Sequence, residues 1–492
     1  MPASAIARPP LLFDRESEWS DLTGFFAGSN DAPRLGLVYG RRRQGKSFML
    51  EHLIAATGGF YHQALEEARR PALERIAAAA AAFAGAPAWT GGHFDDWPAA
   101  FRALADLAGG RPMVIDEFPY LLRESPELPS VIQAAYDGVR SGRHPAFRLL
   151  LCGSALSLMT GLLTGQRALR GRAVLDMAVE SFDFRQSRSY WGISDPGVAL
   201  LVHAVIGGPP GYRDLLDGAV PASEAEFGEW LAAGVLNPSH ALFREAEYLL
   251  TEDPSLVDRA LYRSIIATIA GGGSTRRGVA SRLAKPEGAL DYQLNQLERS
   301  QFIVRDQDLL RPNRPLLRVA DPLLRFHFAV LRPELARFEA RQTREAWASS
   351  EARFASQVLG PHFESLARVW TSRHASTRTI GGRARRVGFV QVNDLLAKQA
   401  FEIDVVAEGE ARVGGKPIIL AVGEAKGGDA VRTMSDLARL ERTRSLLAGR
   451  ADVSQTRLLL FGRSGFDLEV IQTVRRRRDV ELIDLERLYE GD

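Results

Sequence analysis

The segment from residue 40 to residue 47, GRRRQGKS, constrains the fold of this chain more than any other feature. It fits the pattern GxxxxGK followed by Ser or Thr, and it lies between the apolar run LGLVY and an amphipathic helical pattern. Such a loop works only between a strand and a helix, because its backbone N–H groups and the helix N-terminus must converge on phosphate oxygens. The segment therefore predicts a phosphate-binding loop on an α/β scaffold.

The residue types in the loop indicate a nucleoside triphosphate as its ligand. The glycines let the backbone curl, the lysine brings a positive charge to the β- and γ-phosphates, and the serine offers a hydroxyl to Mg²⁺. We expect ATP and Mg²⁺ to bind here. The predicted nucleotide-binding residues of the loop are Gly40, Arg41, Arg42, Arg43, Gln44, Gly45, Lys46 and Ser47.

Two adjacent carboxylates end the apolar run PMVIDEF at residues 112–118. In parallel sheets ligands bind at the carboxyl ends of the strands, so Asp116 is predicted to hold the Mg²⁺ shell through water. Glu117 is predicted to orient or deprotonate the water that attacks the γ-phosphate. Helix capping is the alternative for such a pair, and the phosphate loop favours the catalytic interpretation.

Further polar residues follow the next two apolar runs. Ser154 ends the run at residues 148–155, where it is predicted to contact the γ-phosphate, although a turn-forming serine is the alternative. Arg170 and Arg172 in LRGR are positioned to neutralise transition-state charge, either within the chain or from a neighbouring subunit of a homo-oligomer. The alternative for each is a solvated surface arginine.

Hydrophobic patterns divide the 492 residues into five predicted parts. Apolar runs alternate with helical patterns in the first part and again in the last, which is typical of α/β domains, and three helical patterns followed by strand, turn and strand are typical of a winged helix. The parts are a P-loop NTPase domain with a parallel sheet at 1–190, a helical lid at 191–254, a winged helix at 255–330, a helical connector at 331–350 and a second α/β domain at 351–492.

The order of these motifs resembles that of archaeal-type AAA-like ATPases. The resemblance is carried by YGRRRQGKS, VIDEFPYLL, LLLCGS, LRGR, IGGPPGY and, near the N-terminus, FDRESEW. It implies a P-loop domain of the ASCE type that binds and hydrolyses ATP, a helical lid, a winged helix, and a C-terminal domain related to restriction endonucleases.

Charged residues on two strands of the last part suggest a metal site. Asp404 lies in FEIDVVAE, and Glu424 and Lys426 lie one residue apart in IILAVGEAK, so period two places the latter pair on one face of a hairpin that ends at the turn RVGGKP. Glu364, on the preceding helix, is a further candidate ligand. We expect Glu364, Asp404 and Glu424 to bind a divalent cation and Lys426 to lie near the attacking water.

This pattern resembles the PD-(D/E)xK nuclease core, except that Ile403 replaces the proline. The resemblance implies a restriction-endonuclease-like α/β domain that cleaves phosphodiesters, with Asp404, Glu424 and Lys426 as catalytic residues. Solvated charges on an edge hairpin are the alternative. The basic segment at residues 371–386 is expected to contact the phosphate backbone without base specificity or to form a loop.

Composition limits the compartment and the partners. The chain is 46% hydrophobic and 25% charged, with no apolar run long enough for a membrane span and a single cysteine, Cys152, which predicts a cytoplasmic protein. Residues 1–254 are net acidic and the remainder is net basic, so DNA contacts are expected in the C-terminal half, unless these arginines are only solvated.

Three functions remain open from the sequence. The first is an ATPase that controls a metal-dependent nuclease acting on DNA, and the retention of the Asp, Glu and Lys pattern favours it. The second is a nucleotide-gated switch whose nuclease-like domain binds DNA or a partner without cutting. The third is a DNA-binding regulator built around the winged helix.

Overall fold

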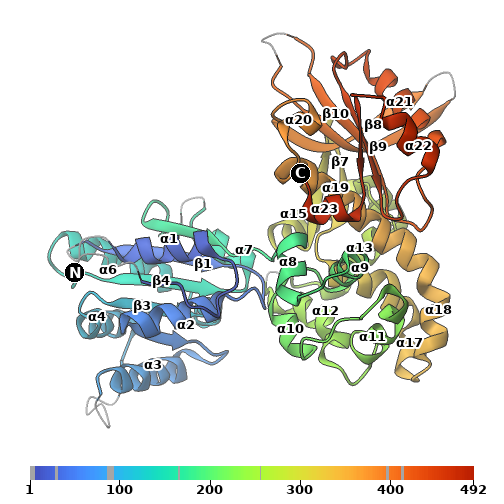
Figure 1. Cartoon of the computed structure of the whole chain (residues 1–492). Helices are drawn as coiled ribbons and strands as arrows, with labels where there is room; N and C mark the ends of the chain where they lie inside the picture. Colours follow the sequence, from blue (N-terminus) through green and yellow to red (C-terminus); the bar gives the residue numbers. More distant parts are fainter. Residues whose placement is uncertain are drawn as a thin grey trace. The chain divides into compact units, whose positions relative to one another are not determined.

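The computed structural model describes residues 6–27, 32–85, 93–164, 167–254, 256–394, 398–411 and 415–492. It has two compact units (Figure 1). The first comprises Met1–Ser181, Pro209–Tyr212 and Leu249–Val257, and the second comprises Phe182–Gly208, Arg213–Tyr248 and Asp258–Asp492. The sequence predicts five parts with a first boundary at residue 190. Most of the residues of the last four predicted parts lie in the second unit.

A parallel sheet of five strands forms the centre of the first unit, as predicted. Its order is β2 (Phe60–Gln63), β3 (Pro112–Asp116), β4 (Arg148–Gly153), β1 (Arg34–Tyr39) and β5 (Ala173–Ala178). The strand β2 is not predicted from the sequence, because four residues are too few for a recognisable pattern. Since β4 lies between β1 and β3, the residues that follow these three strands meet at one edge.

Helices cover both faces of this sheet. One face packs against α1 (Glu16–Phe26) and α2 (Lys46–Thr57); the other packs against α3 (Arg69–Phe83), α4 (Trp97–Ala108) and α6 (Leu128–Arg140) (Figure 1). Along β4, Leu150 and Cys152 pack on the side of α1 and α2, whereas Leu149 and Leu151 pack on the side of α3, α4 and α6. Burial on both faces explains why these strands are continuously apolar in the sequence.

Helices make up the first part of the second unit. They include α8 (Phe184–Trp191), α9 (Pro196–Ile206), α11 (Phe227–Ala233), α13 (Arg259–Ala270), α14 (Arg276–Arg282), α15 (Asp291–Arg299), α16 (Pro322–Phe326) and α18 (Thr343–Phe354), while α10 (Gly211–Leu215) and α12 (Ala241–Glu252) are divided between the two units. The order of α13, α14, α15 and a following hairpin is the order predicted at residues 255–330. Of the helices in the described ranges, none has the length and apolar content to cross a bilayer.

A seven-stranded sheet forms the rest of the second unit. Its order is β12 (Val480–Ile483), β11 (Arg457–Gly462), β10 (Ile419–Lys426), β9 (Gln399–Glu408), β8 (Arg386–Asp394), β6 (Ile303–Asp308) and β7 (Arg311–Val319). The strands β8, β9 and β10 are antiparallel neighbours, whereas β10, β11 and β12 are parallel and are connected by α21 (Met434–Leu447) and α22 (Leu468–Val474). Part of the predicted turn, residues 412–414, lies outside the described residues.

The hairpin β6–β7, predicted as part of a winged helix, pairs with a strand of the C-terminal domain. Asp308 pairs with Phe389 in a parallel bridge, so β6 joins β8 and the hairpin extends the sheet of the C-terminal α/β domain. In addition, Asp308 accepts a hydrogen bond from the backbone N–H of Gln391 at 3.0 Å. The predicted boundary at residue 330 is therefore crossed by strand pairing, which no local pattern reports.

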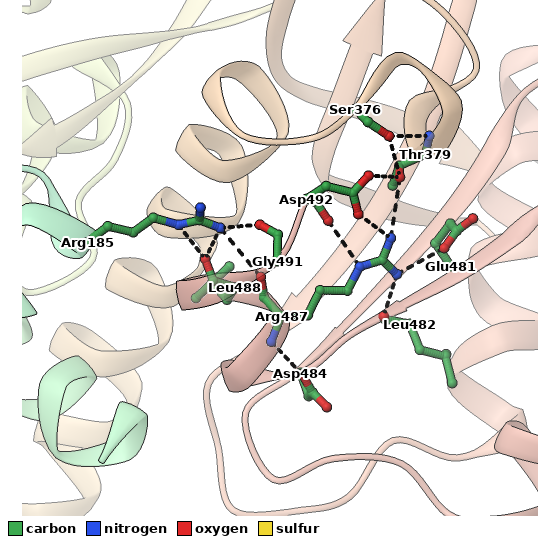
Figure 2. Close-up of polar contacts among 10 residues, drawn as sticks. All are labelled: Arg185, Ser376, Thr379, Glu481, Leu482, Asp484, Arg487, Leu488, Gly491 and Asp492. Atoms are coloured by element: carbon green, nitrogen blue, oxygen red, sulfur yellow. Dashed lines mark hydrogen bonds and ion pairs between the residues drawn. The ribbon is translucent and has the colours of Figure 1, made fainter. Parts of the chain in front are cut away.

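Hydrogen bonds anchor the last residues of the chain within the same unit. The Arg185 guanidinium on α8 donates to the backbone carbonyl of Leu488 (Figure 2). The two nitrogen–oxygen distances are 3.0 and 2.7 Å. The guanidinium of Arg487, on α23 (Leu485–Glu490), donates to Glu481 and pairs with Asp492. Both ends of the second unit's sequence are thus held together.

Candidate nucleotide and metal sites

The phosphate loop connects the end of β1 to the start of α2. Gly45 precedes α2 with a φ of 86°, and no side chain caps the helix, so the first N–H groups of α2 are left for an anion. A Cβ at Gly40 would lie 2.3 Å from the carbonyl oxygen of Val179, which follows β5. Both glycines are therefore required by the backbone path, one for its left-handed conformation and one for close packing.

Lys46 is the first residue of α2, and its ammonium group is held over the loop. The residue is only 5% exposed, and Nζ donates to the backbone carbonyl of Arg41 at 3.0 Å. A buried ammonium with one backbone acceptor retains two further donors. The loop thus presents a positive charge and helix N–H groups at the same place.

Asp116 ends β3 and is fully buried. One carboxylate oxygen accepts hydrogen bonds from Ser47 Oγ at 2.6 Å and from Tyr61 Oη at 2.8 Å, and the other accepts from the N–H of Glu117 at 2.8 Å. The contact between Ser47 and Asp116 brings together the two predicted Mg²⁺-binding groups. Hydroxyl and carboxylate oxygens are the hard donors that Mg²⁺ prefers, so this pair fits the cation.

Glu117 and Ser154 meet across the ends of neighbouring strands. Ser154 Oγ donates to Glu117 Oε2 at 3.0 Å, and Glu117 itself adopts a left-handed φ of 50°. A Cβ at Gly153 would lie 2.5 Å from Pro119 Cδ, so the glycine allows β4 to approach α5 (Phe118–Glu124). Burial raises the pKa of the Glu117 carboxyl, while the charge of Lys46 opposes the rise.

Two elements at this site were not singled out as functional from the sequence. The first is Tyr61 on β2, whose only sequence signal is one aromatic in a short apolar stretch. The second is the segment Pro209–Tyr212, where the N–H of Gly211 donates to the carbonyl of Arg43 at 3.1 Å, and the Arg43 guanidinium lies 5.8 Å from the Tyr212 ring centroid. The segment Pro209–Tyr212 therefore packs on the phosphate loop.

Arg172 is not brought to the phosphate loop. Its guanidinium donates to both carboxylate oxygens of Asp137 at 3.1 and 2.8 Å. Because β5 runs parallel to β1 with Ala173 beside Leu35, Arg172 lies at the edge where β1 begins, whereas the loop follows its end. The prediction that Arg172 contacts the nucleotide of its own chain is thus corrected, and contact with the nucleotide of a second copy stays a hypothesis.

The C-terminal domain brings together three carboxylates. Glu364 on α19 (Gly360–Arg373) and Glu402 and Asp404 on β9 each place an oxygen within 4.8 Å of the others. The register of β8 and β9 shifts between Gly388 and Val390, so an extra residue of β9 bulges beside Asp404. Glu402 was missed in the sequence, although its position two residues before Asp404 indicates a shared strand face.

Glu424 and Lys426 lie on β10, with side chains on one face as predicted. Lys426 Nζ lies 3.4 Å from Glu424 Oε1 and 3.5 Å from Asp436 on α21, and Arg439 Nε of the same helix lies 3.5 Å from Glu424 Oε2. The structure therefore divides the predicted site into the cluster of Glu364, Glu402 and Asp404 and the pair of Glu424 and Lys426.

Electrostatics link these two groups of charges. Burial and the neighbouring Asp404 raise the pKa of Glu364, and burial together with Glu424 and Glu402 raises the pKa of Asp404. Asp404 also accepts a hydrogen bond from the N–H of Ala425 at 2.8 Å. Crowded carboxylates of this kind gain free energy when a divalent cation neutralises them, so the donor set fits Mg²⁺ or Mn²⁺.

Comparisons with known proteins found distant similarities. No family model matches the chain. An uncharacterized protein of Methanocaldococcus jannaschii is 22% identical over 336 residues, which cover 67% of this chain and 71% of that protein. A Walker-type ATPase of Pyrococcus abyssi is 20% identical with a TM-score of 0.49, covering 65% of this chain and 97% of the other. The ORC2 protein of Aeropyrum pernix, in complexes with ADPNP and ADP, is 16% identical with a TM-score of 0.42, covering 68% of this chain and 96% of the other. Similarities this distant assign neither a family nor a function.

Proposed function

We propose that the first unit binds ATP with Mg²⁺ and hydrolyses it. The observation that supports this most is the chain of hydrogen bonds from Ser47 to Asp116, and from Ser154 to Glu117, beside the buried ammonium of Lys46. These residues come from three separate stretches of sequence and meet at the carboxyl edge of a parallel sheet. A structural role alone does not account for a lysine, two carboxylates and two hydroxyls at this edge.

Each residue has a defined task in the proposed reaction. The loop N–H groups and Lys46 bind the phosphate oxygens and stabilise the charge that develops on them. Ser47 and Asp116 would hold Mg²⁺, which neutralises charge on the β- and γ-phosphates. Glu117 accepts a proton from the attacking water, and the hydrogen bond from Ser154 fixes its carboxylate.

The test is ATP hydrolysis by the full chain. Lys46→Ala removes the ammonium, so we expect ATPase activity to disappear while the chain stays folded. Lys285→Ala, at an exposed lysine, is the matched control and should keep the activity of the unaltered chain. Phosphate release that continues at an unchanged rate in Lys46→Ala would refute the proposed site.

We further propose that the C-terminal domain is a metal-dependent nuclease that acts on DNA and that the nucleotide state controls it. The cluster of Glu364, Glu402 and Asp404 supports this, because its oxygens lie close enough to share one cation. A divalent cation held there would lower the pKa of a bound water. Lys426 would stabilise the attacking hydroxide beside Glu424, and the basic segment at residues 371–386 would contact phosphates.

The alternative is a switch or regulator that binds DNA without cutting it. Incubation of plasmid and linear DNA with Mg²⁺ or Mn²⁺, with and without ATP, separates the two. Under our proposal the double variant Asp404→Asn with Lys426→Ala abolishes cleavage, while Glu469→Gln, at an exposed residue of α22, does not. DNA binding without cleavage that is insensitive to the double variant, and lost on deleting residues 255–330, would favour the regulator.

A further inference from the structure

A small cavity opens beside the carboxylate cluster. It has a volume of about 210 Å³ and is lined by residues of α13, β7, α16, α19 and β9. Glu364 and Glu402 of the cluster lie in its wall. The ionisable residues that line it are Asp306, Arg318, Arg325, Glu364, Arg368 and Glu402. We call it the arginine cavity, after the three guanidinium groups in its wall.

Arg325 gives the clearest sign that the arginine cavity takes a ligand. The residue is 3% exposed, and Nη2 donates to the carbonyl of Val319 at 2.6 Å. Among the described residues, its Nη1 has no hydrogen-bond partner. Burial and the neighbouring Arg318 lower the pKa of Arg325 to about 9, so the guanidinium is still charged at neutral pH. A buried guanidinium nitrogen without an acceptor, as Nη1 is here, lowers the stability of the folded chain unless a ligand supplies the acceptor.

The other two arginines are held in place by protein acceptors. Arg318 binds both oxygens of Asp306 at 2.9 and 3.2 Å. Arg368 donates to the backbone carbonyl of Asp404 at 2.8 Å, and its Nη2 lies 3.7 Å from Asp306. Their guanidinium groups are thereby fixed at the wall of the cavity, next to the carboxylate cluster.

The balance of charge favours an anion once a cation is bound. Three arginines face four carboxylates when Asp404 is counted with the residues of the cavity wall. The group therefore carries one net negative charge when all its members are ionised. A divalent cation on the carboxylates changes the net charge to one positive, and this positive charge favours the binding of a phosphate group beside Arg325. Arginine is the side chain best suited to bidentate phosphate binding.

The size of the cavity limits what carries this phosphate. Its volume of about 210 Å³ lies below the range of roughly 300–1,000 Å³ typical of drug-sized ligands. A phosphodiester within a strand is bonded to a nucleoside on each side, whereas a phosphate monoester is bonded to only one. A small cavity accommodates the monoester more readily.

We infer that the arginine cavity binds a phosphate monoester next to the divalent cation, so that the C-terminal domain acts at phosphorylated strand ends or on free nucleotides. This inference rests on the proposed nuclease-like function. It also gives the hairpin β6–β7 a role, because β7 contributes Arg318 to the cavity. The hairpin would then contribute to ligand binding in the cavity in addition to any contact that it makes with DNA.

The test measures binding of short, single-stranded, fluorescently labelled DNA to the full chain in Ca²⁺. The strands carry a 5′-phosphate, a 3′-phosphate or only hydroxyl ends. We expect one of the phosphorylated strands to bind about tenfold more tightly than the hydroxyl strand. Arg325→Lys and Arg318→Gln should remove this preference, and Arg305→Gln, on the same hairpin but outside the cavity wall, should keep it. Arg318 is the more exposed of the two, so its variant carries the test if Arg325→Lys fails to fold.

A second arm separates free nucleotides from strand ends. In a Lys46→Ala background, which removes the phosphate loop as a competing site, AMP that displaces the phosphorylated strand identifies the free nucleotide as the ligand. Failure to displace identifies the strand end. Both results support a monoester site.

A Mn²⁺ titration followed by electron paramagnetic resonance distinguishes failure of the cavity inference from failure of the proposed metal site. If Mn²⁺ binds and is lost in Asp404→Asn, but end phosphates change neither binding nor cleavage, the cavity inference is overturned and the proposed function stands. If the chain binds no Mn²⁺, the proposed metal site falls and the cavity inference falls with it.

Discussion

Replacing Glu117 by glutamine tests the division of tasks at the phosphate loop. The two side chains have the same length, so the amide oxygen of the introduced glutamine can accept the hydrogen bond that Ser154 now donates at 3.0 Å. The backbone needs no change, because a glutamine tolerates the left-handed φ of 50° as well as a glutamate does. What is lost is the ability to take a proton from water.

The expected magnitude follows from that single loss. General base catalysis contributes about 10²- to 10⁴-fold to a rate, which corresponds to roughly 3–5 kcal/mol of activation free energy. The affinity for ATP should rise or stay the same, because the variant removes a negative charge that faces the phosphates beside Asp116. We therefore expect kcat to fall at least 100-fold while the Kd for ATP is unchanged or lower.

The assay pairs steady-state phosphate release with binding of a fluorescent ATP analogue. Glu124→Gln, at the exposed end of the helix that Glu117 precedes, is the matched control and should leave both quantities unchanged. A Glu117→Gln chain that hydrolyses ATP within threefold of the unaltered rate would refute the assignment of the base. Equal loss of binding and hydrolysis would instead point to a structural role.

Two further predictions concern stability. Tyr61→Phe removes the hydroxyl that donates to Asp116 at 2.8 Å, so urea titration should show a free energy of unfolding lower by about 2 kcal/mol, the size of a hydrogen bond to a charged group. No change would mean that water replaces the hydroxyl. His203 and His362 form a buried pair, with Nδ1 of the first 2.9 Å from Nε2 of the second, and burial lowers the pKa of His203 to about 4. Because the unfolded chain binds this proton below about pH 6.5 and the folded chain does not, stability should fall by about 3 kcal/mol between pH 6.5 and 4, and urea titrations of His203→Gln across this range should show a smaller slope. An identical slope in the variant would contradict the assignment.

The sequence by itself determined the features whose causes are local. The loop at residues 40–47 needs its glycines for a backbone path set within a few residues, and its lysine and serine for chemistry that depends on their place in that path. The apolar runs of β1, β3 and β4 identify buried strands, since burial on both faces leaves no polar alternation. Asp116, Glu117 and Ser154 could be placed at the same edge because the strands they follow are parallel.

Tertiary structure decided what depends on pairing between distant segments. Only the register of β5 beside β1 shows that Arg172 lies at the far edge from the loop. Only the shift in register between β8 and β9 and the position of α19 bring Glu402 together with Glu364, while Glu424 lies with α21. The bridge from β6 to β8 likewise merges the predicted winged helix with the C-terminal domain. Hydrophobic periodicity reports which face of an element is buried, but it carries no information on which other element covers that face, and the sites of this protein depend on that second choice.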